Sequence, residues 1–240
     1  MLQIKNLCKK YGDKTALDSI NIEIKNGIHG LLGRNGSGKT TLLKILATLS
    51  KPTSGECFIN GISIDNKKEI RKMIGYIPQE FEFYPEFKCD EFLDYLLLLD
   101  RVAEKEKRKC IIENSLERVN LLQFKNSRIK DLSGGMRRRL CIAQALMNNP
   151  SIVFADEPTS NLDPEERESI RNIFRRVKDD SIIILSSHIL EDLQDCCKEL
   201  TILDYGQVVF SGRISEMMND KYGNSNTLEK AYLNLIRKKE

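Results

Sequence analysis

The sequence predicts an α/β fold, in which an antiparallel β portion precedes a core with a mixed, largely parallel sheet that a helical insertion interrupts. Continuously apolar stretches are typical of parallel strands buried on both faces, and they occur at 28–32, 152–155 and 182–185. Alternating apolar and polar residues indicate half-buried strands at 2–7 and 21–25. Because strand and helix signals alternate after a glycine-rich loop, we expect an α/β core.

Length and composition indicate one soluble domain. A chain of 240 residues fits one domain, or one domain with a lobe. Hydrophobic residues at 40% and charged residues at 30% argue against disorder, and a net charge of +3 is too small to indicate nucleic-acid binding. The longest apolar run, Tyr95–Leu99, falls far short of the roughly 20 residues that span a bilayer.

The N-terminus and the cysteines predict a cytoplasmic protein. Met1–Lys5 is not followed by a long apolar stretch, so we expect no secretory signal. The seven cysteines are scattered, odd in number and without a CxxC pair, which is typical of buried thiols in a reducing compartment. A function at a membrane would make the chain peripheral, on the inner face of the cell membrane.

The other strands are predicted from turn signals. Cys57–Ile64 contains Asn60–Gly61 between β-prone residues and predicts a hairpin. Strands at 202–203 and 208–210, joined by a turn at 204–206, are expected to close the sheet.

Helices are predicted between the strands, and Pro164–Lys178 is the clearest of them. Asp163 can cap this helix, and Glu166 lies three residues after the cap. Its expected buried face consists of Ile170, Ile173, Phe174 and Val177. The other predicted helices are 40–49, 90–101, 103–122 and 136–147, with one or two surface helices in 216–240 and a polar break at 223–226.

Residues 33–40 form a complete phosphate-binding motif. The run Gly-Arg-Asn-Gly-Ser-Gly-Lys-Thr fits GxxxxGK[ST], follows an apolar strand and opens a helix. Backbone N–H groups at glycines can surround phosphate oxygens, Lys39 supplies a charge for the β- and γ-phosphates, and the Thr40 hydroxyl is placed to ligate Mg²⁺. The candidate cofactor-binding residues here are Gly33, Asn35, Gly36, Ser37, Gly38, Lys39, Thr40 and Thr41.

A second apolar strand ends in two carboxylates, Asp156 and Glu157. The first can hold Mg²⁺, and the second can orient or deprotonate an attacking water. We expect the two side chains to point to opposite faces of an extended segment, and so to have different tasks. Together with the phosphate-binding loop, this pair indicates a nucleoside triphosphatase.

The stretch Leu132-Ser133-Gly134-Gly135-Met136 offers a hydroxyl and exposed N–H groups at the positive end of a helix. It resembles the signature sequence of the ABC (ATP-binding cassette) ATPases, usually LSGGQ, with Met136 in place of the glutamine. The resemblance implies that Ser133, Gly134 and Gly135 cap the nucleotide bound by a partner subunit. Such a dimer is head-to-tail, with two ATP molecules between the faces.

Four further residues match positions of motifs in this family. Gln79 matches the Q-loop, whose amide senses Mg²⁺ and the attacking water. Asp163 matches the D-loop, which would add dimer communication to helix capping. His188 matches the switch histidine that contacts the γ-phosphate. Tyr11 lies where an aromatic ring stacks on adenine, and a core or surface tyrosine is the open alternative.

The resemblance covers about residues 2–210 and implies one ABC ATPase domain over 1–240, with a P-loop NTPase core. Its expected parts are a RecA-like core from 1–79 and 136–210, a helical subdomain at 80–135 and a C-terminal helical tail at 211–240. ATP and Mg²⁺ are the implied cofactors. The implied metal contacts are Thr40, Gln79 and Asp156, and the implied catalytic residues are Glu157, His188 and Gln79.

The function that the resemblance implies is that of an ATPase subunit that powers a separate transmembrane permease. A second ABC ATPase chain, identical or different, would complete the dimer. Met136 followed by three arginines resembles the exporter branch, which moves drugs, antibiotic peptides or lipids. We interpret Arg137–Arg139 as a partly solvated helix face, so no nucleic-acid partner is expected. The aromatic residues within 81–87 could pack in the helical lobe or line a groove for the permease.

The alternative is a soluble ABC-type ATPase that acts on the ribosome or on DNA. Such relatives usually carry two cassettes or long coiled-coil or zinc insertions, and nothing of this kind lies between Lys39 and Asp156. A non-catalytic binding module conflicts with the presence of both Glu157 and His188. His29 matches no motif and is expected to be a core or sheet residue.

Overall fold

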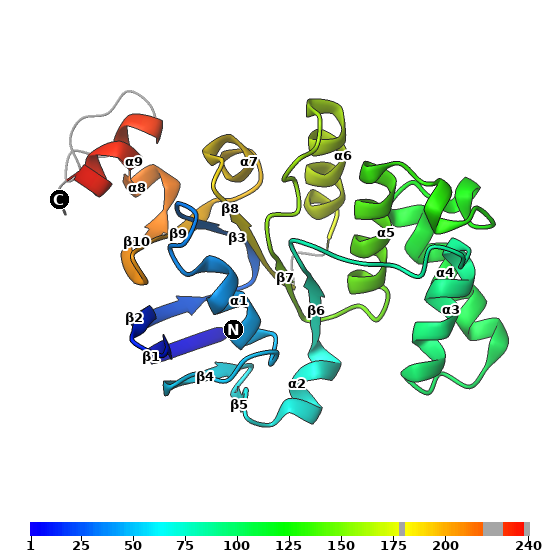
Figure 1. The fold of residues 1–240 in the computed structure, drawn as a ribbon, viewed down its shortest axis with the longest axis horizontal. Coiled ribbons are helices and arrows are strands. Elements are labelled where there is room, and N and C mark those ends of the chain that lie inside the picture. Colours follow the sequence, from blue (N-terminus) through cyan, green and yellow to red (C-terminus); the bar gives the residue numbers. More distant parts are fainter. Residues whose placement is uncertain (178–180, 218–227, 238–240) are drawn as a thin grey trace.

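Two β-sheets organise the computed structural model, which describes residues 1–177, 181–217 and 228–237 (Figure 1). The first sheet is antiparallel, with the strand order β2-β1-β4-β5. Its strands are β1 (Leu2–Tyr11), β2 (Lys14–Ile24), β4 (Ser54–Ile59) and β5 (Ile62–Ser63). Asn60 and Gly61 connect β4 to β5 with φ angles of 50° and 81°, as a tight hairpin turn requires, so the predicted hairpin is confirmed.

The second sheet has the strand order β10-β9-β3-β8-β7-β6. Its strands are β3 (Gly27–Leu32), β6 (Ile74–Ile77), β7 (Ile152–Ala155), β8 (Ile182–Ser187), β9 (Glu199–Asp204) and β10 (Gln207–Arg213). All neighbours pair in parallel except β10, which runs antiparallel to β9. The carboxyl ends of the parallel strands therefore meet at one edge, where the predicted motifs follow β3, β6, β7 and β8.

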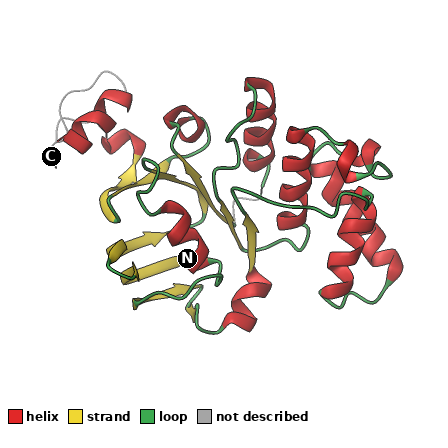
Figure 2. Ribbon diagram, viewed as in Figure 1, coloured by secondary structure: helices red, strands yellow, loops and turns green. Residues whose placement is uncertain are grey.

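Helices cover the second sheet and form the insertion. They are α1 (Lys39–Leu46), α2 (Lys67–Met73), α3 (Cys89–Leu99), α4 (Lys105–Arg118), α5 (Gly134–Leu146), α6 (Pro164–Arg175), α7 (Leu190–Gln194), α8 (Ile214–Met217) and α9 (Leu228–Arg237), with 3₁₀ turns at η1 (Leu122–Phe124) and η2 (Ile129–Asp131). Figure 2 shows the helices of the insertion at the opposite end of the molecule from the antiparallel sheet. The predicted fold class and the helical insertion are confirmed.

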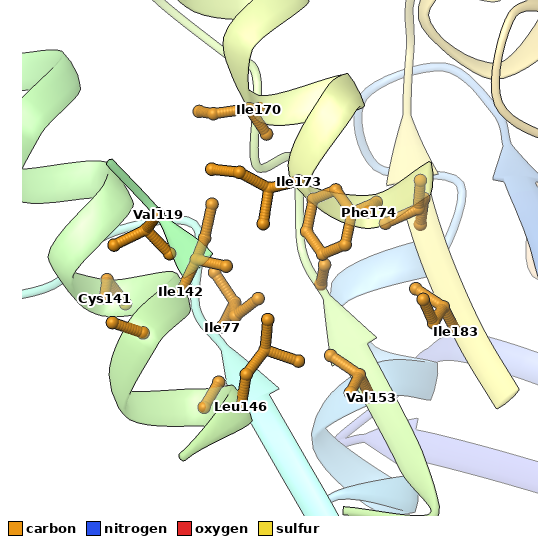
Figure 3. Close-up of a cluster of buried hydrophobic side chains, with 14 of the residues drawn as sticks. Ile77, Val119, Cys141, Ile142, Leu146, Val153, Ile170, Ile173, Phe174 and Ile183 are labelled. Atoms are coloured by element: carbon orange, nitrogen blue, oxygen red, sulfur yellow. The ribbon is translucent and has the colours of Figure 1, made fainter. Parts of the chain in front are cut away.

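Helices α5 and α6 pack against β6, β7 and β8 through buried apolar side chains (Figure 3). These side chains are Cys141, Ile142 and Leu146 from α5, Ile170, Ile173 and Phe174 from α6, and Ile77, Val153 and Ile183 from the strands. Each fully buried aliphatic or aromatic side chain contributes about 1.5–3 kcal/mol relative to an exposed one. This packing fixes where α5 and α6 begin, and the signature and D-loop residues lie at those two helix starts.

The start of α6 follows the predicted capping pattern. Asp163 Oδ1 accepts a hydrogen bond of 2.8 Å from the Glu166 backbone N–H, and Pro164 is the first helical residue. Ile170, Ile173 and Phe174 are buried, and the partly buried Val177 packs against the same core.

Several boundaries differ from the prediction for identifiable reasons. The helix predicted at 103–122 ends as α4 at Arg118, and Asn120 then adopts a left-handed φ of 56°. The helix predicted from 136 begins at Gly134, because the Ser133 side chain accepts a hydrogen bond from the Met136 backbone N–H and caps it. The strands of the β1–β2 hairpin extend further toward their connecting turn than predicted. Strand β1 continues to Tyr11, past the predicted end at residue 7, and β2 begins at Lys14, before the predicted start at residue 21. The unpredicted elements are α2, β6, α7 and the 3₁₀ turns η1 and η2.

The C-terminal tail is only partly helical. Because β10 continues to Arg213, the expectation of a helical tail from residue 211 is wrong at its start. Helices α8 and α9 agree with the expectation, and the polar break predicted at 223–226 lies outside the described residues. Among the cysteines, all of which are free thiols, Cys110 is exposed, so it is an exception to the expectation of buried thiols.

Candidate nucleotide-binding site

The loop between β3 and α1 packs closely against the backbone of β2 and β9. Gly36 and Gly38 have φ angles of 82° and 107°, which side chains with a Cβ rarely adopt. A Cβ at Gly38 would lie 2.7 Å from the Ala16 carbonyl oxygen, and one at Gly33 would collide with the Leu203 carbonyl oxygen. The glycines at these positions therefore allow the tight turn and the close packing of this loop.

Lys39, the first residue of α1, is buried, and its ammonium group lies inside this loop. Its Nζ donates hydrogen bonds to the carbonyl oxygens of Gly33, at 2.6 Å, and Arg34, at 3.2 Å. The Glu157 Oε1 atom lies 3.5 Å from the same Nζ. Burial lowers the pKa of Lys39, and the negative charges of Glu157 and Asp156 partly oppose that shift. The site thus holds a cation next to the loop amides.

Asp156, directly after β7, is fully buried and only partly satisfied. Its Oδ1 accepts a 2.7 Å hydrogen bond from the Ser186 hydroxyl, which itself accepts one from the Glu157 backbone N–H at 2.9 Å. The Oδ2 atom is buried and has no hydrogen-bond partner in the described structure. A buried carboxylate oxygen without a partner is costly, and a divalent cation or a metal-bound water would satisfy it. The residues present therefore fit Mg²⁺.

Glu157 lies between a lysine and a histidine. Its Oε2 is 3.0 Å from His188 Nδ1, at the end of β8, while its Oε1 faces Lys39. The backbone of Glu157 is left-handed, with a φ of 46°, so the expectation of an extended segment is wrong. The strand ends at Ala155, and this turn directs the Glu157 side chain toward the loop, away from the Asp156–Ser186 contact. The two carboxylates still have different partners.

A cavity of about 360 Å³ opens at this edge of the sheet. The lining includes seven predicted cofactor-binding residues, which are Tyr11, Asn35, Gly36, Gly38, Lys39, Thr40 and Thr41. It also includes the predicted catalytic residues Gln79 and Glu157, and Lys14 and Ala16, which were not predicted. The predicted residues outside the lining are Gly33, Ser37, Asp156, His188, Ser133, Gly134, Gly135 and Asp163. A larger cavity, of about 580 Å³, lies among the ends of α4, α5 and α6, and its lining contains none of the predicted site residues.

Comparisons with known proteins identify the family of this site. Residues 17–160 match the family described as ABC transporter. This chain belongs to the ABC transporter family. It is an ATP-binding subunit of that family, with the α/β cassette fold of the ABC ATPases. Within the described part of the chain, no helix has the length and apolarity needed to cross a membrane.

Relatives and solved structures cover most of this ABC cassette. It is 37% identical over 95% of its length to the uncharacterized ABC transporter ATP-binding protein YxlF of Bacillus subtilis, of which it covers 76%. It is 34% identical over 93% of its length to the Nod factor export ATP-binding protein I of Cupriavidus metallidurans, of which it covers 74%. The dimeric structure of MJ0796, a bacterial ABC transporter cassette, matches 89% of this chain and 98% of that one, with 30% identity and a TM-score of 0.80.

The signature residues of the cassette do not line the cavity. Ser133 and Gly134 are exposed, and a Cβ at Gly134 would meet nothing within 4 Å. Gly135 is buried against Glu166 of α6, so its small size lets α5 and α6 approach each other. The structure therefore does not bring the signature to the nucleotide pocket of its own chain. This placement agrees with the expectation that it acts on a partner's nucleotide.

The interpretation of Arg137–Arg139 as a solvated face is wrong for two of the three arginines. Successive helical residues are about 100° apart, so three in a row do not share a face. Arg137 is exposed. Arg138 is buried and donates hydrogen bonds to the carbonyl oxygens of Pro78 and Gln79. Arg139 is largely buried and forms an ion pair of 3.2 Å with Glu166.

Two residues next to the site, Tyr232 and Ser186, belong to none of the motifs recognised in the sequence. Tyr232 of α9 lies close to Arg34 of the phosphate-binding loop: burial raises the pKa of its phenol, and the positive charge of Arg34 partly opposes that shift. No local pattern relates these two residues, which are nearly 200 positions apart. Ser186 supports Asp156 and could have been suspected from its place just before His188. His29, expected in the core or sheet, is buried in β3.

Proposed function

We propose that this cassette hydrolyses ATP to power a separate transmembrane permease, through ATP-driven closure of two cassettes. One observation supports this most directly: the Glu157 carboxylate lies between Lys39 and His188 at the wall of the phosphate-binding cavity. Such hydrolysis uses a carboxylate that orients and deprotonates the attacking water, beside a cation that stabilises phosphate charge. The Glu157 carboxylate and the Lys39 ammonium supply this pair.

Each residue would have one main task in this mechanism. Lys39 and the amides of residues 33–38 bind the β- and γ-phosphates, and Tyr11, which is half exposed at the cavity rim, stacks on adenine. Glu157 orients the attacking water, while His188 holds Glu157 and contacts the γ-phosphate. Mg²⁺, when bound, would be held by Thr40, Gln79 and Asp156 and would neutralise phosphate charge.

A second cassette would complete each site. Ser133, Gly134 and Gly135 contact the phosphates of the partner's nucleotide, and Asp163 links the two sites while it caps α6. ATP then holds the dimer together, and hydrolysis releases it. We propose that the chain divides into a core of residues 1–79 and 136–210 and a helical subdomain at 80–135, with the tail helices α8 and α9 after the end of β10.

A Glu157→Gln variant tests the role of the carboxylate. The amide keeps the size and the left-handed backbone position but does not act as a base, so turnover should fall by about 100-fold or more while ATP still binds. In size-exclusion chromatography with ATP and Mg²⁺, the variant should accumulate as a dimer. Turnover equal to that of the wild type would contradict the assignment of Glu157.

We favour export as the direction of transport. Several of the similar proteins are Nod factor export ATP-binding proteins, with 32–34% identity, and one is a probable sulfate/thiosulfate import ATP-binding protein from Chlorella vulgaris, with 33% identity. The proposed substrate class is therefore drugs, antibiotic peptides or lipids, moved by the exporter branch that the signature stretch resembles.

The proposed permease contact lies on the helical insertion. The aromatic residues after Gln79 divide into two groups, of which one packs inside: Phe83 contacts Phe81 and Phe92, with ring centroids 5.1 Å apart in both cases. The other group is Tyr84, Phe87 and Tyr95, and the two tyrosines are exposed. This second group would dock against a permease helix from its place next to the Q-loop.

A pull-down of the tagged chain from detergent-solubilised membranes tests the permease. Mass spectrometry should identify a multi-span protein in stoichiometric amounts, and a Tyr84→Ser, Tyr95→Ser variant should lose it while keeping ATP hydrolysis by the isolated chain. Ribosomal or DNA-bound partners without a membrane protein would leave the ATPase chemistry intact and refute the transport function.

A further inference from the structure

Arg138 joins the signature helix to the Q-loop within one cassette. Helix α5 begins at Gly134, and Arg138 lies one helical turn further on, on the face that packs against β6. Its two terminal nitrogens donate hydrogen bonds of 3.0 Å each, one to the carbonyl oxygen of Pro78 and one to that of Gln79. The side chain is only 7% exposed, so this contact is made away from bulk water.

The geometry of this contact is rigid on both sides. A guanidinium is a planar fork of fixed N–H directions, and here it engages two consecutive carbonyl groups. The same guanidinium carbon lies 4.7 Å from the centroid of the Phe81 ring, which in turn packs edge-on against Phe83. Arg138 is thereby held between the backbone of the Q-loop and the aromatic packing of the insertion.

We propose that Arg138 is a positioning residue, which fixes the backbone at Gln79 relative to the nucleotide of its own chain and transmits movement of the signature stretch to it. The proposal rests on the proposed role of Gln79. The residues Ser133–Gly135 start the helix that carries Arg138, and Gln79 lines the nucleotide cavity. When a partner's nucleotide engages the start of α5, Arg138 carries any shift of the helix directly to the Q-loop carbonyls.

The first test compares Arg138→Met, Arg138→Lys and the control Arg137→Met, which changes an exposed arginine on the same helix. Misplacing a catalytic group by about 1 Å can reduce turnover 100-fold, so Arg138→Met should lower kcat by about tenfold or more. The KM for ATP should change less than about twofold, because the phosphate-binding loop is untouched. Arg138→Lys should restore part of kcat, since an ammonium can still donate to one of the carbonyls. Arg137→Met should behave as the wild type.

The second test repeats Arg138→Met in a Gln79→Ala background. Because Arg138 acts through Gln79, its substitution should lower kcat no further there. An equal loss of kcat in both backgrounds, or no loss from Arg138→Met in the wild type, would overturn the positioning role of Arg138 and leave the proposed role of Gln79 standing. Wild-type turnover of Gln79→Ala would overturn the proposed role of Gln79, and the inference with it. If Arg138→Met does not fold, Arg138→Lys in both backgrounds gives the same comparison.

Discussion

Compared with the signature stretch at 133–135, the phosphate-binding loop at 33–40 is enclosed by its own chain at Gly33, Ser37 and Lys39. Lys39 is 5% exposed and held by two loop carbonyls, whereas Ser133 and Gly134 face solvent at the start of α5. An enclosed loop has its donors arranged before the ligand arrives, and this lowers the cost of binding. An exposed helix start needs a second body to complete it. In the proposed mechanism both surfaces bind phosphate, and the signature stretch does so only on the nucleotide of a second cassette.

The largest expected effect comes from placing a bulky cation on the exposed surface. Ser133→Arg should abolish turnover, because the side chain blocks the approach of a second cassette, and should leave ATP binding by the monomer nearly unchanged. Binding of a fluorescent ATP analogue at low protein concentration, measured beside steady-state hydrolysis, separates the two effects. Asn114→Arg, which adds the same single charge at an exposed position of α4, is the control.

Lost binding by the Ser133→Arg monomer would break the comparison, since Ser133 would then belong to the site of its own chain. Retained binding with retained turnover would instead show that the exposed surface takes no part in hydrolysis.

A smaller effect distinguishes the two glycines of the signature. A Cβ at Gly135 would lie 2.7 Å from Glu166 Cγ, and Arg139 holds that carboxylate in place, so Gly135→Ala should destabilise the fold by about 1–3 kcal/mol. For a chain of this size, this corresponds to roughly 2–4 °C in melting temperature per kcal/mol. Gly134→Ala meets open space and should not lower the melting temperature.

The double variant Gly135→Ala, Glu166→Ala provides the control for that contact. It should recover part of the melting temperature, because the colliding carboxylate is gone. A Gly135→Ala variant as stable as the wild type would mean that α5 and α6 adjust at no cost.

The smallest expected effect is a pH dependence of stability caused by His29, in the strand β3 that leads into the phosphate-binding loop. Burial lowers the pKa of His29 to about 4, from an ordinary value of about 6.5. Its Nε2 contacts Thr201 Oγ1 at 2.9 Å, and Glu199, half exposed and 4.0 Å from Nδ1, does not offset the burial. The unfolded chain binds the proton more readily, so His29 should reduce stability as the pH falls from about 6.5 toward 4.

Melting curves of the wild type and His29→Gln between pH 7.5 and 4.5 measure this effect. The wild type should lose more melting temperature over that range than the variant does. Parallel pH dependences would mean that His29 titrates alike in the folded and unfolded chains.

The enclosed site was the easier half to predict, because the function of the phosphate-binding loop depends on a contiguous run of residues. Lys39 and Thr40 could be placed from the motif, and the apolar stretch before it predicted β3. The contact between Arg138 and Pro78 joins residues 60 positions apart, so no local pattern contains it. The left-handed backbone of Glu157 was also missed, because an extended conformation is the ordinary expectation after a strand.

Position 157 must both adopt a left-handed backbone and carry a side chain that reaches Lys39 and His188. Saturation mutagenesis at this position would separate the two requirements. Valine and isoleucine are strained at a φ of 46° and belong to a class with poor expression. Asparagine and glycine accept that backbone but are too short to bridge Lys39 and His188, so they belong to a class that accumulates normally and is inactive. A deep mutational scan that measures both abundance and activity should therefore find both classes of replacement at this residue.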